Sequence, residues 1–406
     1  MAVVEQTVSL TEDTLSRIQD ELRALGLDGW LLYNFHGNNP IAARILGLPA
    51  MTRRWFVLLP AEGRPVAVTH RIEQQPWTGW IGENRPYLAW RELEERLADL
   101  VRGRQVALEY SAADAVPYVD LVPAGVVEML SAAGARLASS ADLVSAFYAR
   151  WSDEGLASHR RAATTLHAIV HEAFARAAAA VKAGETITEL ELRRWIAGEQ
   201  AARGLTVGAE AIVAVNGNAA NPHYAPTAEN HAPIREGDTL LIDLWGKEEG
   251  DDAVYADQTW MAYVGAEVPD RIRAIWEAAR DARLAACALV RQRWDAGEPV
   301  TGCELDDASR SVIVQRGFGE AFIHRTGHSI DRELHGSGPN IDNLETRDTR
   351  RLIPGVGFSI EPGIYLAGDV GFRTEVDVYM GPDGPEVTTP NPQTELYPLL
   401  HPDFGR

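Results

Sequence analysis

Cysteine is nearly absent from this chain of 406 residues. The two that occur, Cys287 and Cys303, each fall in a stretch whose pattern predicts a helix. Two cysteines cannot form a disulfide framework, and they cannot form a thiolate metal site by themselves. We therefore expect a cytoplasmic protein.

Basic residues are also scarce. The 38 Lys and Arg residues face 58 Asp and Glu residues, which gives a net charge of −20. Such a balance disfavours binding to phosphate backbones and to anionic membrane surfaces. We expect neither a nucleic acid nor a membrane as a partner.

Long apolar runs are missing as well. A membrane-spanning helix needs roughly 20 apolar residues, and Arg176 interrupts the Ala-rich stretch 173–181. Residues 1–14 are acidic and contain no basic segment followed by an apolar one, so we expect no secretory signal.

The chain is longer than one hydrophobic core usually supports, which predicts two domains. In the first part, a helical pattern at 10–25 precedes short apolar strands at 30–35, 55–59, 66–69 and 106–109, with further helices at 93–102 and 119–133. This alternation predicts an α/β layer. A long helix capped by Ser152 then begins at Asp153, so we predict domains at 1–152 and 153–406.

The second part contains an internal repeat. Residues 183–192 align with 296–305 at an offset of 113, and the same offset pairs Arg203-Gly204 with Arg316-Gly317. Each copy is predicted to consist of two helices and a strand pair, 239–245 with 254–264 and 356–365 with 371–380. Chance similarity between Ala-rich helices is the alternative, but the acidic residues described next recur with equal spacing in both copies.

Four acidic residues stand in these strand pairs. Asp243 lies in an apolar strand, and Asp257 follows 14 residues later on the partner strand. Facing carboxylates repel unless a proton or a cation lies between them. Glu361 and Glu375 repeat this spacing of 14 residues. Each acid alone fits a salt-bridged strand residue, but two hairpins about a pseudo-twofold axis predict four carboxylates that hold two divalent ions.

Histidines supply further donors. His328 lies in a Gly-His-Ser-Ile segment, and imidazole beside carboxylates suits a divalent transition metal. The spacing of His324 and His328 matches a helical zinc pair, but Gly327 interrupts the segment and no Glu follows His324, which excludes a thermolysin-type motif. We expect His324 and His231 to be ordinary hydrogen-bonded residues.

Together these residues resemble the pita-bread metallopeptidases, which include Xaa-Pro dipeptidase (prolidase), Xaa-Pro aminopeptidase and methionine aminopeptidase. The resemblance covers about residues 153–390, and the first domain is similar to that of creatinase. It implies an α/β (α+β) fold with duplicated helix-helix-hairpin units. It also implies that two metal ions are bound by Asp243, Asp257, His328, Glu361 and Glu375.

The resemblance further implies roles around the scissile bond. His223 and His335 would contact the substrate and take part in catalysis, and Glu361 would shuttle a proton. Arg373, two residues before Glu375, would pair with a carboxylate of the protein or of the substrate. The family also implies a homodimer. Carboxylate-rich sites favour manganese, with cobalt, zinc and iron as alternatives.

This sequence departs from the family pattern in three places. Gly336 follows His335 where the family usually has an acid, Trp260 follows Thr259 where the family has Arg, and the turn between Asp243 and Asp257 is longer by about three residues. These changes spare the predicted ligands but affect the expected specificity pocket.

The favoured function is an exopeptidase that cleaves short peptides at Xaa-Pro bonds. Three alternatives remain open: an exopeptidase or carboxypeptidase without proline specificity, an ectoine hydrolase-type enzyme that cleaves a non-peptide C–N bond, and a non-catalytic binding module. Creatinase-like chemistry without metals disagrees with the retention of all five predicted ligands.

Overall fold

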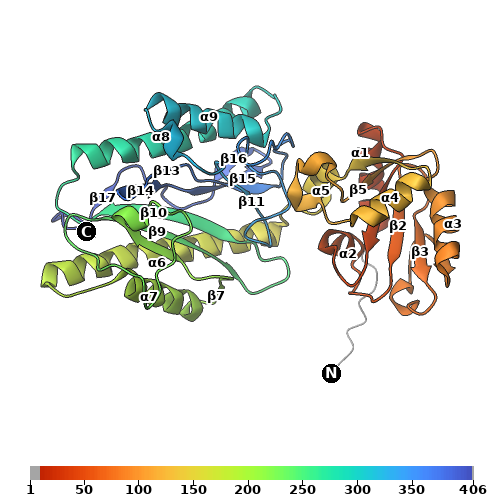
Figure 1. Ribbon diagram of the computed structural model, residues 1–406, viewed down its shortest axis with the longest axis horizontal. Coiled ribbons are helices and arrows are strands. Elements are labelled where there is room, and N and C mark those ends of the chain that lie inside the picture. Colours follow the sequence, from red (N-terminus) through yellow and green to blue (C-terminus); the bar gives the residue numbers. More distant parts are fainter. Residues whose placement is uncertain (1–9, 405–406) are drawn as a thin grey trace. The chain divides into compact units, whose positions relative to one another are not determined.

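The computed structural model describes residues 10–404. The chain divides into two compact units, Met1–Tyr148 and Ala149–Arg406, so the division falls close to the boundary predicted at 152. Figure 1 shows the elements of both units. Among the described residues, no helix is both long and apolar enough to cross a membrane.

The described part of the first unit contains a six-stranded sheet with the strand order β4-β3-β2-β1-β5-β6. Its strands are β1 (Gly29–Asn34), β2 (Trp55–Pro60), β3 (Val66–His70), β4 (Glu83–Tyr87), β5 (Gln105–Leu108) and β6 (Arg136–Ser139). The helices are α1 (Glu12–Ala24), α2 (Pro40–Leu46), α3 (Trp90–Val101), α4 (Ala124–Ala132) and α5 (Ala141–Phe147), with short 3-10 turns η1 (Gln75–Trp77), η2 (Ala112–Asp114) and η3 (Pro117–Val119).

The predicted α/β layer is thus confirmed, although helices α2 and α5 and strands β4 and β6 were not predicted. The helix predicted over 119–133 begins at Ala124, because Pro123 precedes it and a residue before proline avoids the helical conformation. Strand β4 was not predicted because its sequence Glu-Asn-Arg-Pro-Tyr lacks the alternating apolar residues of a typical strand. Helix α1 follows its pattern closely, since Thr11 caps it and Leu15, Ile18 and Leu22 are buried.

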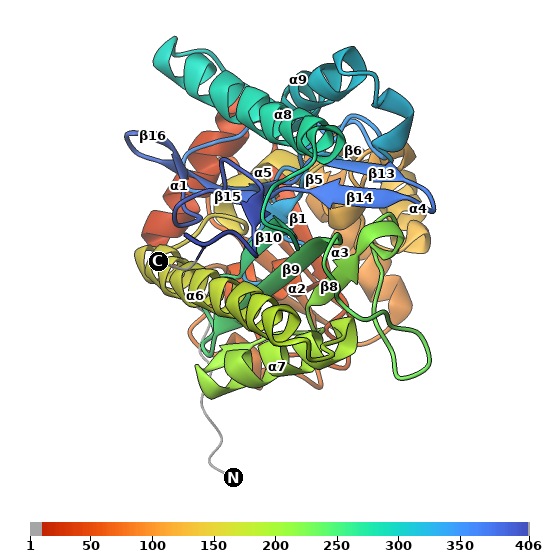
Figure 2. The same ribbon diagram turned by 90° about the vertical axis from the view of Figure 1, so that its left-hand side faces the viewer.

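The second unit contains the helices α6 (Asp153–Ala183), α7 (Glu189–Ala202), α8 (Asp270–Asp295) and α9 (Gly302–Gln315), with short turns η4 (Asn216–Asn218) and η5 (Gly319–Ala321). Its strands are β7 (Leu205–Thr206), β8 (Ile212–Val215), β9 (Thr239–Glu248), β10 (Ala256–Tyr263), β11 (Ser329–Ile330), β12 (Gly357–Ile360), β13 (Gly363–Leu366), β14 (Val370–Arg373), β15 (Val376–Gly381), β16 (Gly384–Val387) and β17 (Tyr397–Pro398). Figure 2 shows α6 and α7 on one side of these strands and α8 and α9 on the other.

The structure confirms the repeat. Helices α7 and α9 each have 14 residues and begin with a capping box, formed by Thr188 with Glu191 and by Thr301 with Glu304. These two boxes are 113 residues apart, which is the offset found in the sequence. Cys287 and Cys303 lie in α8 and α9 as predicted, and both are free thiols.

The two hairpins differ in continuity. Strands β9 and β10 pair without interruption from Thr239 to Gly246. The second pair is broken, because β12 pairs with β15 while β13 pairs with β14. The expectation that Glu361 and Glu375 lie within strands was therefore wrong: both lie in the break, where Pro362 cannot donate a ladder hydrogen bond.

Candidate functional site

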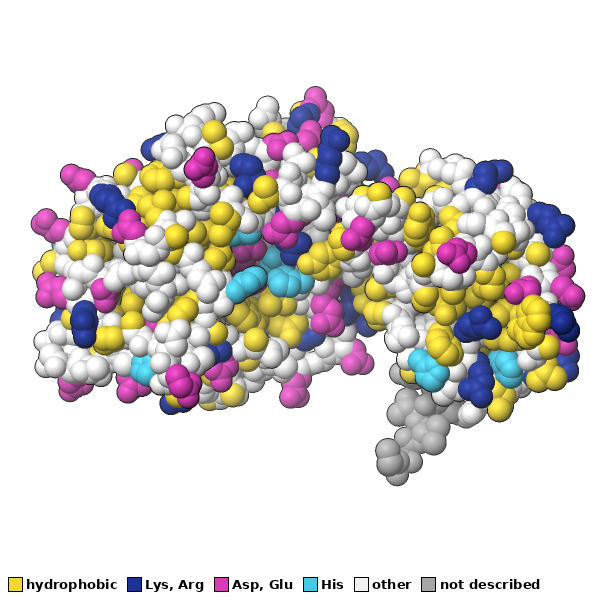
Figure 3. All heavy atoms as spheres, viewed as in Figure 1, with side chains coloured by type: hydrophobic (Ala, Val, Ile, Leu, Met, Phe, Trp, Pro, Cys, Tyr) yellow, Lys and Arg dark blue, Asp and Glu magenta, His cyan; other side chains and the backbone are white. Residues whose placement is uncertain are grey.

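One cavity of about 680 Å³ in the second unit contains every residue that the sequence pointed to. The eight side chains are those of His223, Asp243, Asp257, His328, His335, Glu361, Arg373 and Glu375. Figure 3 shows histidine and acidic side chains gathered in a hollow on this unit. The fold thus brings together residues that are up to 152 positions apart in the chain.

The register of the first hairpin places its two aspartates on one face, as predicted. Asp243 of β9 lies opposite Thr259 of β10, and Asp257 lies opposite Trp245. Because side chains two residues apart point to the same side of a strand, Asp243 and Asp257 are diagonal neighbours. Both are buried.

His328 joins these acids from the second half of the unit. Its Nε2 lies 3.6 Å from Asp257 Oδ2 and 3.4 Å from Glu361 Oε1. Its Nδ1 lies 3.0 Å from the carbonyl oxygen of Ser329, which accepts a hydrogen bond when Nδ1 carries the proton. That tautomer leaves the Nε2 lone pair facing the acids, and burial lowers the pKa of His328, so the ring stays neutral.

Three buried oxygens in the cavity lack a hydrogen-bond donor within residues 10–404: Oδ1 of Asp243, Oδ1 of Asp257 and Oε1 of Glu375. Burial raises the pKa of Asp257 well above its usual range, and the nearby Asp243 raises it further. The pKa of Glu375 is raised in the same way by burial and by Asp257. Asp257 and Glu375 therefore resist ionisation unless a cation joins them.

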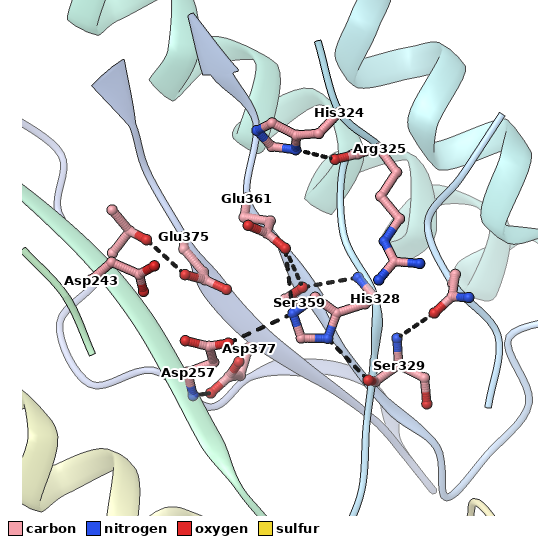
Figure 4. Close-up of polar contacts among 12 residues, drawn as sticks. Asp243, Asp257, His324, Arg325, His328, Ser329, Ser359, Glu361, Glu375 and Asp377 are labelled. Carbon is pink, nitrogen blue, oxygen red and sulfur yellow. Dashed lines mark hydrogen bonds and ion pairs between the residues drawn. The ribbon is translucent and has the colours of Figure 1, made fainter. Parts of the chain in front are cut away.

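The donor set fits such a cation. Ligand atoms of Asp257, His328 and Glu375 lie within 4.8 Å of one another. Figure 4 shows these three side chains pointing toward a common centre, with Glu361 beside them. Carboxylate oxygens with one imidazole nitrogen suit a divalent transition metal.

Arg373 partly balances this negative charge. Its Nη2 donates to Asp243 Oδ2, its Nε donates to Thr259 Oγ1 at 3.1 Å, and its Nη1 donates to the hydroxyl of Tyr365 at 3.1 Å. Of the two partners expected for Arg373, a carboxylate of the protein is therefore present. Asp243 keeps its second oxygen for another ligand.

His324, expected to be an ordinary residue, is held by hydrogen bonds. Its Nε2 lies 2.7 Å from the Tyr365 hydroxyl and its Nδ1 lies 2.6 Å from the carbonyl oxygen of Arg325. In Figure 4 its ring lies apart from Asp257, His328 and Glu375, although His324 also lines the cavity. No helix contains it, in agreement with the exclusion of a helical zinc pair. His231 is exposed and contacts the carbonyl oxygen of Thr227 at 2.8 Å.

His223 and His335 are exposed on the cavity wall. The His335 ring meets the His328 ring edge-on, with centroids 4.4 Å apart. His223 lies in the loop between β8 and β9, and this loop is anchored by the buried carboxylate of Glu189. Glu189 accepts hydrogen bonds of 2.7 Å from the Val215 N–H, the Tyr224 hydroxyl and the Ala232 N–H.

Sequence reasoning missed Glu189, because an acid in the first turn of a helix already has a role at the helix N-terminus. It also missed Asp377, which is fully buried in β15 and accepts a 2.9 Å hydrogen bond from the backbone N–H of Asp257. The available signal was the one used for Asp243, an acid inside an apolar strand between Val376 and Val378.

The departures from the family pattern have unequal effects. Trp260 is buried on the opposite face of β10 from Asp257, and its ring is met edge-on by His167 and His171 of α6 at 5.2 and 5.3 Å. Trp260 therefore does not line the cavity. The longer hairpin does reach the cavity, through Trp245 and Tyr255.

Duplicated helix-helix-hairpin units around an acid-lined cavity define the pita-bread class of fold. A family model described as metallopeptidase family M24 matches residues 160–382, more than half of the chain. The chain therefore belongs to metallopeptidase family M24, which confirms the predicted relationship.

Individual relatives agree with this membership. An Xaa-Pro dipeptidase of Lactobacillus delbrueckii subsp. lactis is 38% identical over 167 residues, which cover 41% of this chain and 40% of that protein. The match thus spans about two fifths of that relative.

Solved structures resemble the whole fold. Dipeptidase PepE from Mycobacterium ulcerans has a TM-score of 0.69 at 23% identity, covering 95% of this chain and 96% of that chain. An X-prolyl aminopeptidase from Caenorhabditis elegans, described as a cytosolic enzyme with a di-nuclear active site, has a TM-score of 0.63 at 16% identity, covering 90% of this chain and 58% of that chain. Similarity at these identities concerns the fold alone.

Proposed function

We propose that this protein is a two-metal exopeptidase that hydrolyses short peptides at Xaa-Pro bonds. The observation that carries the proposal is the set of buried, donor-free oxygens of Asp243, Asp257 and Glu375 in one cavity. Membership in metallopeptidase family M24 supports the same chemistry.

Asp243, Asp257, His328, Glu361 and Glu375 would hold the two ions, and the carboxylate-rich donor set favours manganese over cobalt, zinc or iron. Bound divalent ions acidify a water molecule and stabilise negative charge on a carbonyl oxygen. The protein itself buries the acidic side chains and holds them in fixed orientations. Thr259 orients Glu375 through a 2.8 Å hydrogen bond, and Arg373 orients Asp243.

Glu361 is suited to move a proton. Its Oε1 lies 3.4 Å from His328 Nε2 and 3.3 Å from the Ser359 hydroxyl, while its Oε2 lies 3.9 Å from Arg373 Nε. Burial raises the pKa of Glu361, which favours transient protonation of this carboxyl by the proton that the attacking water gives up. The carboxyl then passes this proton to the departing nitrogen.

His223 and His335 are placed to contact the peptide. Both are exposed on the cavity wall, and His335 stands edge-on against the predicted ligand His328. Imidazole N–H groups at these positions bind the peptide carbonyl and stabilise the oxyanion that forms there. Arg373 lines the same cavity, and its Nε, Nη1 and Nη2 donate to Thr259, Tyr365 and Asp243, so its first role is to hold Asp243 in place.

The proposed Xaa-Pro preference rests on the similarity to the Lactobacillus Xaa-Pro dipeptidase and on an apolar wall of the cavity. Trp245, Tyr255 and Leu334 line one side of the cavity and belong to a single hydrophobic cluster. An apolar wall accommodates the proline ring, which carries no polar groups beyond its backbone.

A peptide panel tests the function. Purified protein with Mn²⁺ is expected to release free amino acid from Xaa-Pro dipeptides, and Asp257→Ala is expected to abolish the release. Xaa-Pro-Yaa peptides, non-proline peptides and end-blocked controls distinguish dipeptidase, aminopeptidase and carboxypeptidase action. Ectoine is added to the panel for the alternative C–N hydrolase. Inactivity toward all of these substrates would refute the proposal.

We also propose that the protein is a cytoplasmic homodimer, on the strength of the family resemblance. Light scattering on the purified protein is expected to give twice the chain mass of 44.4 kDa. A mass equal to one chain would contradict the dimer.

A further inference from the structure

The turn that carries His335 is organised by one buried carboxylate. Asp331 is 1% exposed, and its Oδ1 accepts a 2.8 Å hydrogen bond from the Glu333 N–H. Its Oδ2 accepts a 3.1 Å hydrogen bond from the Ser337 N–H. The carboxylate therefore joins both ends of residues 333–337, the segment with His335 at its middle.

Gly336 is required by this arrangement. A Cβ atom at position 336 would lie 2.8 Å from Asp331 Cγ and 2.9 Å from Ser329 Oγ, closer than real Cβ contacts allow. The Gly336 N–H also donates a 2.7 Å hydrogen bond to the carbonyl oxygen of Ser329. The acid that the family usually has after its second histidine therefore has no room here, and Asp331 supplies a carboxylate from inside the turn.

The long β9–β10 hairpin supports the same turn. The Tyr255 N–H donates a 3.1 Å hydrogen bond to the carbonyl oxygen of Asp331, and Lys247 Nζ donates to the carbonyl oxygen of Arg332. Leu334 packs in one hydrophobic cluster with Tyr255. Two of the departures from the family pattern, the extended hairpin and Gly336, are thus parts of one structure.

This structure fixes where His335 stands. Gly336 is tied to Ser329, and Ser329 directly follows His328, so the turn and the predicted ligand share an anchor. The two histidine rings meet edge-on with centroids 4.4 Å apart. A shift of the turn would change the distance between the His335 imidazole and any peptide that lies beside His328.

We propose that Asp331 is the positioning residue for His335, and that Gly336 and the extended β9–β10 hairpin exist in this chain to accommodate and support it. Asp331 lines no part of the cavity and acts through the turn. The inference rests on the proposed function for its kinetic consequence, whereas its structural consequence stands without it.

The kinetic test is a double-mutant cycle between Asp331→Asn and His335→Ala. Asparagine has the same shape as aspartate but can accept only one of the two N–H bonds with its single oxygen. When His335 is present, we expect Asp331→Asn to lower kcat about tenfold and to leave KM nearly unchanged. A fall of this size corresponds to the loss of one charge-assisted hydrogen bond. In the His335→Ala background the same change is expected to alter kcat less than about twofold.

Two further variants sharpen the test. Gly336→Ala is expected to reproduce the effect of Asp331→Asn, because its methyl group displaces the same carboxylate. Glu333→Gln is the matched control: this exposed acid lies on the same turn, and only its backbone bonds to Asp331. It is expected to behave as the wild type. Bound metal is measured in every variant and is expected to be unchanged.

A second readout needs no activity. With 13C-labelled histidine, the ring signal of His335 among the 11 histidines is assigned by its loss in His335→Ala. In the metal-free protein this signal is expected to move in Asp331→Asn and in Gly336→Ala and to stay in place in Glu333→Gln.

The outcomes separate the two proposals. A wild-type protein that hydrolyses no substrate refutes the proposed function, while the histidine spectra still decide the role of Asp331. Unmoved His335 signals in both variants would overturn the positioning role. An equal loss of kcat with and without His335 would do the same, since it would indicate general destabilisation. If Asp331→Asn fails to fold, Gly336→Ala and the control provide the comparison.

Discussion

The hydroxyl of Thr259 donates a 2.8 Å hydrogen bond to Glu375 Oε2, and Thr259 Oγ1 accepts a 3.1 Å hydrogen bond from Arg373 Nε. Thr259 belongs to the first hairpin, whereas Arg373 and Glu375 belong to the second half of the duplicated unit. A single buried hydroxyl of the first repeat therefore contacts Glu375 and Arg373 of the second repeat, and Arg373 in turn donates to Asp243 of the first.

Thr259→Val should weaken metal binding without disturbing the fold. Valine keeps the β-branched shape that suits a strand but removes the hydrogen-bond donor to Glu375 and the acceptor for Arg373. Mutation of a residue that hydrogen-bonds to a metal ligand typically lowers the affinity for the metal about 10- to 100-fold. We expect a Mn²⁺ dissociation constant at least about tenfold higher by titration calorimetry. Thr164→Val, which alters an exposed hydroxyl on α6, serves as the control. Equal affinity in both variants would contradict the role of Thr259.

Asp257→Asn should separate metal binding from stability. Burial and Asp243 raise the pKa of Asp257, so its charge opposes folding when no cation is present. The metal-free variant is therefore expected to have a Tm equal to or above that of the metal-free wild type. Saturating Mn²⁺ should raise the Tm of the wild type by a few degrees, since ligand at 100 times Kd adds about 2.7 kcal/mol, and should leave the variant unchanged. A variant that responds to Mn²⁺ as the wild type does would argue against Asp257 as a ligand.

Glu189→Gln should affect the loop that carries His223. The glutamine amide would place a donor against N–H and O–H groups that now donate to a carboxylate, including those of Val215 and Ala232. Unsatisfied buried donors cost about 1–3 kcal/mol each. We expect a loss of about 2 kcal/mol in the free energy of unfolding and a reduced kcat/KM. Glu199→Gln, a half-exposed position on the same helix, is the control. The prediction is wrong if urea denaturation shows equal stability for the two variants.

Glu109 in the first unit should make stability depend on pH. This carboxyl is buried and accepts hydrogen bonds from Trp30, Asn39 and Ser140, and burial raises its pKa from 4.5 to about 6. The folded state thus binds the proton more tightly than the unfolded state. Stability should increase as pH falls through about 6 and level off below about 4.5, with a total gain of ~2 kcal/mol.

The measurement is urea unfolding between pH 4.5 and 7.5. Hydrogen exchange of the backbone amides of β1 reports the unfolding of the first unit. The difference between the wild type and Glu109→Gln isolates this group, because other titrating groups contribute equally to both. A difference that does not vary with pH would show that the carboxyl titrates normally in the folded state.

Much of the site could be predicted from the sequence because its signals are local. An acid inside an apolar strand, as at Asp243, needs a compensating partner wherever the strand lies. Equal spacing of the acids in two copies indicated a shared centre before any contact was known. The capping boxes at Thr188 and Thr301 are likewise local and recur at the same offset.

Other features were decided only by tertiary structure. Glu189, Asp331 and Asp377 accept hydrogen bonds from backbone groups, and a backbone N–H has no sequence signature. The role of Trp260 depended on which face of β10 packs on α6, and the break at Glu361 and Glu375 depended on how β12 to β15 pair.

The sequence by itself therefore determined the duplicated helix-helix-hairpin plan and the four matched acids, because periodicity, caps and buried charge act over short stretches of chain, whereas the family resemblance indicated His223 and His335. Tertiary structure alone decided which oxygens remain without donors and how the turn at Asp331 holds His335. These properties depend on distances between atoms that are far apart in the sequence.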